Sequence, residues 1–174
     1  VIKELRRYPD LIETLVTVTA QHRQMLDQPL QLFDITPDYD LDIMEREQTL
    51  SRLSARILER LDEILVSERP DLVLVHGDTT TALIASLGAF YNQIPVGHVE
   101  AGLRTPDKYL PFPEEMNRRL VDVIADLYFP PTKSAKANLL AQGAREEDIY
   151  LTGNTVIDAL LDIASREYEF EDPI

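Results

Sequence analysis

The alternation of apolar and polar positions along the chain predicts helices and strands that follow one another in turn. The clearest helix is predicted over 48–67, where apolar residues recur at three- and four-residue steps between charged ones. The clearest strand is 72–75, because its uniformly apolar LVLV leaves no wet face, as in the centre of a parallel sheet. The other predicted elements are helices at 1–5, 21–31, 82–91, 114–125, 133–141 and 156–164, strands at 11–20, 94–99, 127–129 and 149–151, and a loop at 34–43.

This order of elements predicts the fold class. Strands that alternate with helices at such spacing form right-handed crossovers, and so we expect an α/β domain of Rossmann-like type with a parallel sheet covered by helices on both faces. We expect residues 1–166 to form this domain without its first strand, which would precede Val1. The acidic tail 167–174 shows no core pattern and is expected to begin a linker to a second domain.

Composition and charge narrow the range of partners. The chain is 44% apolar and 28% charged, which is ordinary for a globular protein, and no apolar run approaches the roughly 20 residues of a membrane span. The formal net charge of -14 argues against nucleic acid or an anionic membrane as partner, since both require a basic surface. The absence of cysteine excludes disulfides and thiolate metal sites.

The acidic run Asp38-x-Asp40-x-Asp42 invites a calcium interpretation. A calcium-binding loop also needs glycine at its sixth position and glutamate at its twelfth, and this chain has Ile43 and Thr49 there. We therefore interpret the run as a solvated acidic loop and expect no metal.

Three carboxylates are the strongest candidates for chemistry. Asp78, Glu100 and Glu114 all fall at strand-to-helix junctions, and the carboxyl ends of parallel strands face one crevice. Structural alternatives exist, because Asp78 would also suit a helix N-cap and Glu114 would also suit the positive end of a helix dipole. Glu100 is harder to explain structurally, since a carboxylate directly after a buried strand requires a partner or a function.

Basic and polar residues near the same junctions are candidates for ligand binding. His98 could position a substrate or be a hydrogen-bonded core residue. Arg104 and Arg118 are candidate contacts to an anionic ligand, with ion pairing as the structural alternative for Arg118. The TGNT sequence at 152–155 fits either a phosphate at a helix N-terminus or a simple turn with an N-cap. Neither GxGxxG nor GxxxxGK[ST] occurs.

Five long motifs, which follow one another along the whole chain, are similar to those of a known family. Together they resemble the amino-terminal domain of the bacterial non-hydrolysing UDP-N-acetylglucosamine 2-epimerases. This resemblance implies one half of a two-domain glycosyltransferase-B-like fold, with the active site between the domains. The motifs are TAQHRQMLDQ (19–28), VLVHGDTTTALIASLGAFY (73–91), IPVGHVEAGLRT (94–105), PFPEEMNR (111–118) and TGNTVIDALL (152–161).

The resemblance also implies a reaction. The family interconverts UDP-N-acetylglucosamine and UDP-N-acetylmannosamine by eliminating UDP to a 2-acetamidoglucal and adding UDP back. Its functional carboxylates match Asp78, Glu100 and Glu114. We expect Asp78 and Glu114 to transfer protons at C2 and Glu100 to position or stabilise the glucal-like transition state, with His98, Arg104 and Arg118 binding the substrate. No metal or other cofactor is expected.

Further expectations follow from the same resemblance. Many bacterial members bind a second, regulatory UDP-N-acetylglucosamine, and its contacts match Gln21, His22 and Gln24. Family members are typically cytoplasmic homodimers that serve polysaccharide biosynthesis, with UDP-N-acetylglucosamine and UDP as ligands.

Two alternatives stay open at this level. The protein could be an epimerase for a related UDP-diacetamido sugar or a hydrolysing relative that releases N-acetylmannosamine. It could instead be a catalytically silent nucleotide-sugar-binding module, although the presence of all three carboxylates argues against that. Because the first strand and the second domain are expected outside 1–174, we expect no turnover from this chain alone.

Overall fold

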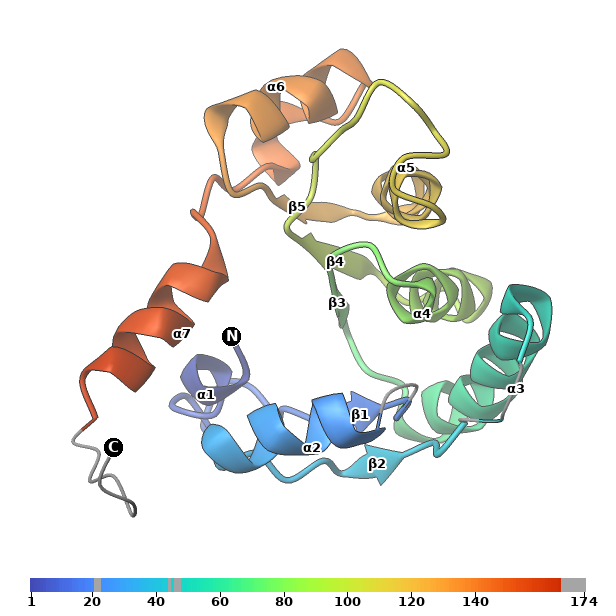
Figure 1. Cartoon of the computed structure of the whole chain (residues 1–174), viewed down its shortest axis with the longest axis vertical. Coiled ribbons are helices and arrows are strands. Elements are labelled where there is room, and N and C mark those ends of the chain that lie inside the picture. The colour runs from blue at the N-terminus through green and yellow to red at the C-terminus, as the bar shows by residue number, and fades with distance from the viewer. Residues whose placement is uncertain (21–22, 44, 46–47, 167–174) are drawn as a thin grey trace, which may run out of the picture.

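The computed structural model describes residues 1–20, 23–43, 45 and 48–166. Helices and strands alternate along most of the chain, as the sequence pattern predicts (Figure 1). In chain order they are α1 (Ile2–Leu5), β1 (Thr17–Val18), α2 (Arg23–Leu32), β2 (Tyr39–Asp40), α3 (Leu50–Glu68), β3 (Val73–His76), α4 (Thr80–Tyr91), β4 (Val96–Val99), α5 (Glu114–Ile124), β5 (Leu127–Phe129), α6 (Lys133–Ala141), a 3-10 turn η1 (Glu146–Asp148) and α7 (Thr155–Ala164).

All strand pairs in the described part of the chain are parallel. β3, β4 and β5 form one sheet with the fully buried β4 in its centre, and β1 pairs with β2 in a second, two-stranded sheet. Figure 1 shows α4 and α5 together on one side of the larger sheet and α7 on the other. Residues of β3, β4, α1 and α7 line a pocket of about 740 Å³. The predicted α/β class with parallel strands is therefore confirmed.

Three local predictions were wrong or incomplete. The strand expected over 11–20 is reduced to Thr17–Val18, and the loop expected over 34–43 contains β2. β2 forms because the backbone amides of Tyr39 and Leu41 donate to the carbonyls of Val16 and Val18, at 3.1 and 2.9 Å. The strand expected over 149–151 is only a single parallel bridge from Ile149 to Tyr128.

The main core lies between the larger sheet and the helices that cover it. Its centre is made of buried side chains from β3, β4, α4, α5 and α6, which remove apolar surface from water and so supply most of the driving force for folding. Gly97 of β4 leaves room for Leu74 of β3, because a Cβ at Gly97 would lie 2.6 Å from Leu74 Cδ2. A second cluster joins α3 to α4 through Ile43, Ile57 and Ile84.

One edge of β3 carries no strand in the part of the chain that the structure describes. The amides of Val73 and Gly77 point to β4, where they donate to Pro95 O and Val99 O at 2.9 Å each. Because backbone groups alternate along a strand, those of Leu74 and His76 point to the opposite edge. β3 is thus an edge strand here, although its apolar sequence is typical of a central one.

The last helix keeps much of its apolar surface exposed. Asn154 caps α7 by accepting a hydrogen bond of 3.0 Å from the amide of Val156, which favours the N-cap interpretation of the TGNT sequence. Four apolar residues of this helix are more than half exposed: Val156, Ile157, Leu160 and Leu161.

Candidate functional site

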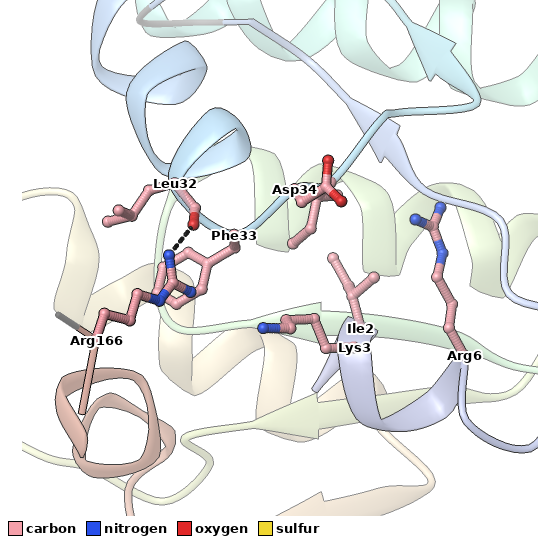
Figure 2. A pocket seen from close by; sticks show the side chains of 8 residues that line it. Ile2, Lys3, Arg6, Leu32, Phe33, Asp34 and Arg166 are labelled. Atoms are coloured by element: carbon pink, nitrogen blue, oxygen red, sulfur yellow. Dashed lines mark hydrogen bonds between the residues drawn. The ribbon is translucent and has the colours of Figure 1, made fainter. Parts of the chain in front are cut away.

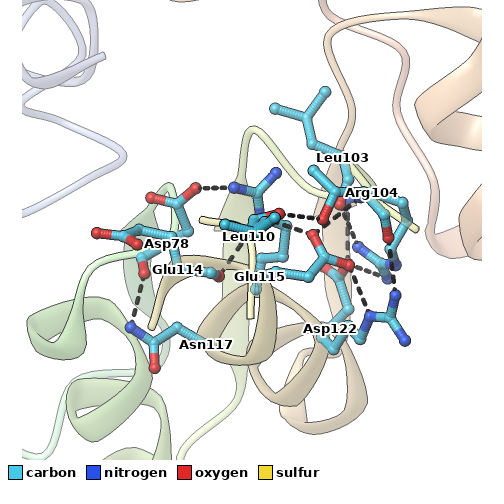
Figure 3. A network of polar contacts seen from close by, with 12 residues as sticks. Asp78, Leu103, Arg104, Leu110, Glu114, Glu115, Asn117 and Asp122 are labelled. Atoms are coloured by element: carbon cyan, nitrogen blue, oxygen red, sulfur yellow. Dashed lines mark hydrogen bonds and ion pairs between the residues drawn. The ribbon is translucent and has the colours of Figure 1, made fainter. Parts of the chain in front are cut away.

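Asp78 lies in the tight turn between β3 and α4. Thr79, and not Asp78, caps α4, since its Oγ1 accepts from the amide of Ala82 at 3.2 Å. The Asp78 carboxylate is held instead by Arg118, whose Nη2 lies 2.5 Å from Oδ2. The Asp78 carbonyl accepts from Asn117 Nδ2 at 2.8 Å, so two residues of α5 fix this residue from two directions (Figure 3).

Glu100 follows β4 directly and has an unusual backbone conformation. Its φ of +67° lies in the left-handed region, which costs a residue with a side chain about 1–2 kcal/mol. Its amide donates to Phe129 O at 3.1 Å, and its Oε1 lies 3.2 Å from Nε2 of His76. A Cβ at Gly77 would be 3.8 Å from Glu100 Oε2, so this carboxylate lies over the turn that carries Asp78.

Glu114 is the first residue of α5. Its side chain is half-buried, and none of the described residues forms a hydrogen bond or ion pair with its carboxylate. Figure 3 shows Glu114 beside Asp78 on the same side of the polar network. The structure thus brings Asp78 close to both of the other predicted carboxylates.

A buried glutamate that sequence analysis missed supports this arrangement. Glu115 is fully buried and accepts from the amide of Thr105 at 3.0 Å and from Arg119 Nε at 2.6 Å, while Arg118 Nε lies 3.5 Å away. The Glu-Glu and Arg-Arg pairs in EEMNRR stand three and four residues apart, a spacing that places opposite charges on one helix face. From the sequence, that spacing could have predicted the ion pairs of Glu115 with Arg118 and Arg119.

His98 and Arg104 point into the protein. His98 is fully buried, with Nδ1 at 2.5 Å from Asp122 Oδ1 and Nε2 at 2.8 Å from the carbonyl of Gly77. Arg104 donates to the other oxygen of Asp122 at 2.6 Å and also to Gln142 Oε1. The imidazole of His98 and the guanidinium of Arg104, which were expected to bind substrate, are thus engaged in contacts within the protein. Their positions favour structural roles for both residues. Asp122 was not singled out from the sequence.

The expected regulatory residues are only partly covered. Gln21 and His22 lie outside the described residues, and Gln24 falls within α2 without a described side chain.

A separate hollow of about 320 Å³ lies between α1, the end of α2 and Arg166 (Figure 2). Its cations are already paired, since Lys3 and Arg166 both contact Asp162, at 3.3 and 2.7 Å. These hydrogen bonds lower the pKa of the Asp162 carboxyl below its ordinary value. Two cations thus share one carboxylate, and the lining of the hollow includes none of the three candidate carboxylates, so it adds nothing to the carboxylate site.

Two negative observations apply to the described residues. Their acidic and histidine side chains form no cluster of three or more that could hold a metal ion. None of their helices combines the length and the apolar character needed to cross a membrane.

A parallel sheet with acidic side chains beyond the carboxyl ends of adjacent strands defines an α/β domain whose ligand crevice lies at those ends. The chain belongs to the UDP-N-acetylglucosamine 2-epimerase family, whose model matches residues 3–173. The UDP-N-acetylglucosamine 2-epimerase of Bacillus subtilis is 58% identical over 159 residues, which are 91% of this chain and 42% of that protein. That of Escherichia coli K12 is 59% identical over 149 residues, or 86% of this chain and 40% of the relative. The chain thus spans about two fifths of the length of these relatives.

Solved structures give the same result for the fold. The Neisseria meningitidis UDP-GlcNAc 2-epimerase bound to UDP-GlcNAc matches with a TM-score of 0.89 at 52% identity, covering 92% of this chain and 43% of that one. The Methanocaldococcus jannaschii enzyme in complex with UDP-GlcNAc and UDP matches with a TM-score of 0.85 at 36% identity, covering 94% and 46%. The chain therefore has the fold of one half of glycosyltransferase-B-like epimerase structures.

Proposed function

We propose that this chain is the amino-terminal part of an enzyme that interconverts UDP-N-acetylglucosamine and UDP-N-acetylmannosamine. The reaction would eliminate UDP to give a 2-acetamidoglucal and then add UDP back after the proton returns to the other face of C2. Family membership and the UDP-GlcNAc bound to the Neisseria relative support the substrate class. The observation that carries the proposal is the gathering of Asp78, Glu100 and Glu114 around one turn and one helix N-terminus.

The chemistry of the substrate explains why several carboxylates are needed. The proton at C2 is not adjacent to a carbonyl, so its removal must be coupled to departure of UDP from C1. A base is required on one face of the sugar and an acid on the other. We assign proton transfer to Asp78 and Glu114, and positioning of the glucal-like transition state to Glu100.

The surroundings of each carboxylate suit these roles. Glu114 stands at the start of α5, and none of the described residues pairs with its carboxylate, so a substrate can reach this base without displacing a partner. Asp78 is oriented by Arg118, which would also contribute positive charge where the leaving diphosphate departs. Homodimerisation, a cytoplasmic setting and a regulatory site at Gln21, His22 and Gln24 belong to the same proposal.

The test is proton NMR of the full-length protein with UDP-N-acetylglucosamine in heavy water. We expect a UDP-N-acetylmannosamine signal together with deuterium at C2, and loss of both in the Asp78→Asn variant. Asp62→Asn is the matched control, because Asp62 is an exposed residue of α3 whose carboxylate accepts from Asn92 Nδ2 at 2.8 Å, outside the carboxylate site. Removing a proton-transfer group costs about 10²–10⁴-fold in rate.

Each other outcome would reject a defined part of the proposal. Free N-acetylmannosamine as product would indicate a hydrolysing enzyme. An unlabelled sugar that still binds would indicate a different UDP-sugar substrate or a silent binding module, and the carboxylate assignments would then be withdrawn.

A further inference from the structure

A buried pair of residues, His98 and Asp122, lies beneath the carboxylate site and takes no part in the reaction proposed above. His98 has no exposed surface, and the Asp122 side chain is 2% exposed. The imidazole spans from Asp122 of α5 to the carbonyl of Gly77 at the end of β3, with contacts of 2.5 and 2.8 Å. A polar pair with so little access to solvent cannot contact substrate, so its role must be internal.

The contacts define the hydrogen bonding of the pair. A carbonyl oxygen only accepts hydrogen bonds, so Nε2 of His98 carries a proton to donate to Gly77. Nδ1 of His98 faces the first oxygen of Asp122, and the second oxygen accepts from the amide of Gly102 at 3.1 Å and from Arg104 at 2.6 Å. The imidazole is thus held at both ends, by α5 and by the end of β3.

The same pair joins the three elements that carry the catalytic candidates. Gly77 precedes Asp78, His98 stands two residues before Glu100, and Asp122 lies two turns after Glu114 on α5. Gly77 has a φ of +71°, a conformation that fixes the direction in which the chain leaves β3. The hydrogen bond from His98 to its carbonyl therefore orients the peptide from which Asp78 begins.

We propose that His98, oriented by Asp122, is a positioning residue that sets the Gly77–Asp78 turn against α5 for proton transfer at C2. The activity part of this inference depends on the proposed function, whereas the hydrogen bond from His98 Nε2 to Gly77 O does not. Two residues of α5, Asn117 and Arg118, already hold Asp78. The imidazole of His98 adds support from the buried side of the turn.

The first measurement is nitrogen NMR of the full-length protein labelled with ¹⁵N-histidine, at neutral pH, with the His98 signals assigned by their loss in His98→Gln. We expect Nε2 of His98 to carry a proton that exchanges slowly with solvent, and Asp122→Asn to make this exchange faster because the ring loses its second contact. An Nε2 without a proton in the unmodified protein would overturn the proposal whatever the enzyme does.

The second measurement is the kinetics of Asp122→Asn. We expect kcat to fall about 10- to 100-fold, because a small displacement of a catalytic group costs up to about 10²-fold, while KM stays within about threefold. Ser86→Ala is the matched control, since Ser86 is equally buried but bonds only within its own helix, to Ala82 O at 2.8 Å. Unchanged kcat in a folded Asp122→Asn protein would overturn the positioning role.

These two measurements separate failure of the inference from failure of the proposed function. The NMR arm needs no turnover, so it remains decisive if the protein turns over no UDP-sugar. It needs a folded variant only for assignment, and His98→Asn serves for this if His98→Gln does not fold.

Discussion

Arg118 reaches from α5 to the turn after β3 and places its Nη2 2.5 Å from Oδ2 of Asp78. The Arg118 side chain is only 11% exposed, whereas that of Asp78 is 31% exposed. The partly exposed end of this pair is thus the carboxylate, which leaves Asp78 accessible to a ligand while its direction is fixed from inside the protein.

Replacing Arg118 with lysine tests this arrangement. A lysine ammonium cannot reproduce the planar fork that contacts Asp78 and the Glu115 side chain together. We expect kcat/KM of the full-length enzyme to fall about 10²-fold, because Asp78 loses its fixed orientation. Arg145→Lys, at an exposed pair on η1, is the control and should change kcat/KM less than twofold. Equal activity of the two variants would contradict the role given to Arg118.

Glu115→Gln should be strongly destabilising. The buried carboxylate balances Arg119 and part of Arg118, and breaking such a pair leaves a buried charge at a cost of about 3–5 kcal/mol. Urea unfolding of the variant should show this loss. Glu146→Gln removes an exposed partner of Lys136 and should cost less than about 1 kcal/mol. A similar small loss for Glu115→Gln would show that the network contributes little to stability.

Glu100→Gly should separate stability from activity. Glycine adopts positive φ without steric cost, so relief of the strain should raise the free energy of unfolding by about 0.5–1 kcal/mol. Activity should be lost, because the carboxylate is removed. Arg69→Gly is matched to it, since Arg69 ends α3 with a φ of +46° and lies outside the site. Arg69→Gly should gain similar stability and keep its activity. A loss of stability in both glycine variants would argue against backbone strain at these positions.

Tyr128→Phe should reduce the loss of stability at alkaline pH. Burial raises the pKa of the Tyr128 hydroxyl above its ordinary value, and the hydroxyl lies 2.7 Å from Ala125 O. Above pH about 10 the unfolded chain loses this proton while the folded protein retains it. The stabilising contribution of Tyr128 is therefore fully present below that pH. It declines as the pH rises through the pKa of the folded state, by up to about 1.4 kcal/mol per pH unit.

The corresponding measurement is denaturant unfolding of both proteins between pH 8 and 11. At pH 8 the phenylalanine variant should be about 1 kcal/mol less stable, because it lacks the hydrogen bond. The difference should then shrink as the pH rises. Parallel curves for the two proteins would exclude Tyr128 as a source of the alkaline decline.

The sequence predicted the parts of the fold that depend on local patterns. The period of apolar residues located α3, because a helix that buries one face has apolar residues at regular steps. The uniform LVLV located β3, because a strand that is buried on both faces is apolar at every position. β2 could not be found in this way. It exists because the amides of Tyr39 and Leu41 donate to the carbonyls of Val16 and Val18, a contact between segments about 20 residues apart that no local pattern records.

The same distinction holds for the candidate site. Asp78, Glu100 and Glu114 were found because each stands at a strand-to-helix junction, which sequence can locate. The inward direction of His98 could not be found, since it depends on Asp122, a residue 24 positions away on another element. A histidine near a strand end gives the same signal whether its ring faces a ligand or the core.

Among the described residues, the edge of β3 that faces away from β4 pairs with no other strand. The backbone groups of Leu74 and His76 form a ready template for one more extended peptide, and such edges promote aggregation unless they are covered. Covering this edge is therefore a requirement for handling residues 1–174 by themselves. A charged substitution at the partly exposed Leu74 would be a practical way to keep the isolated domain in solution.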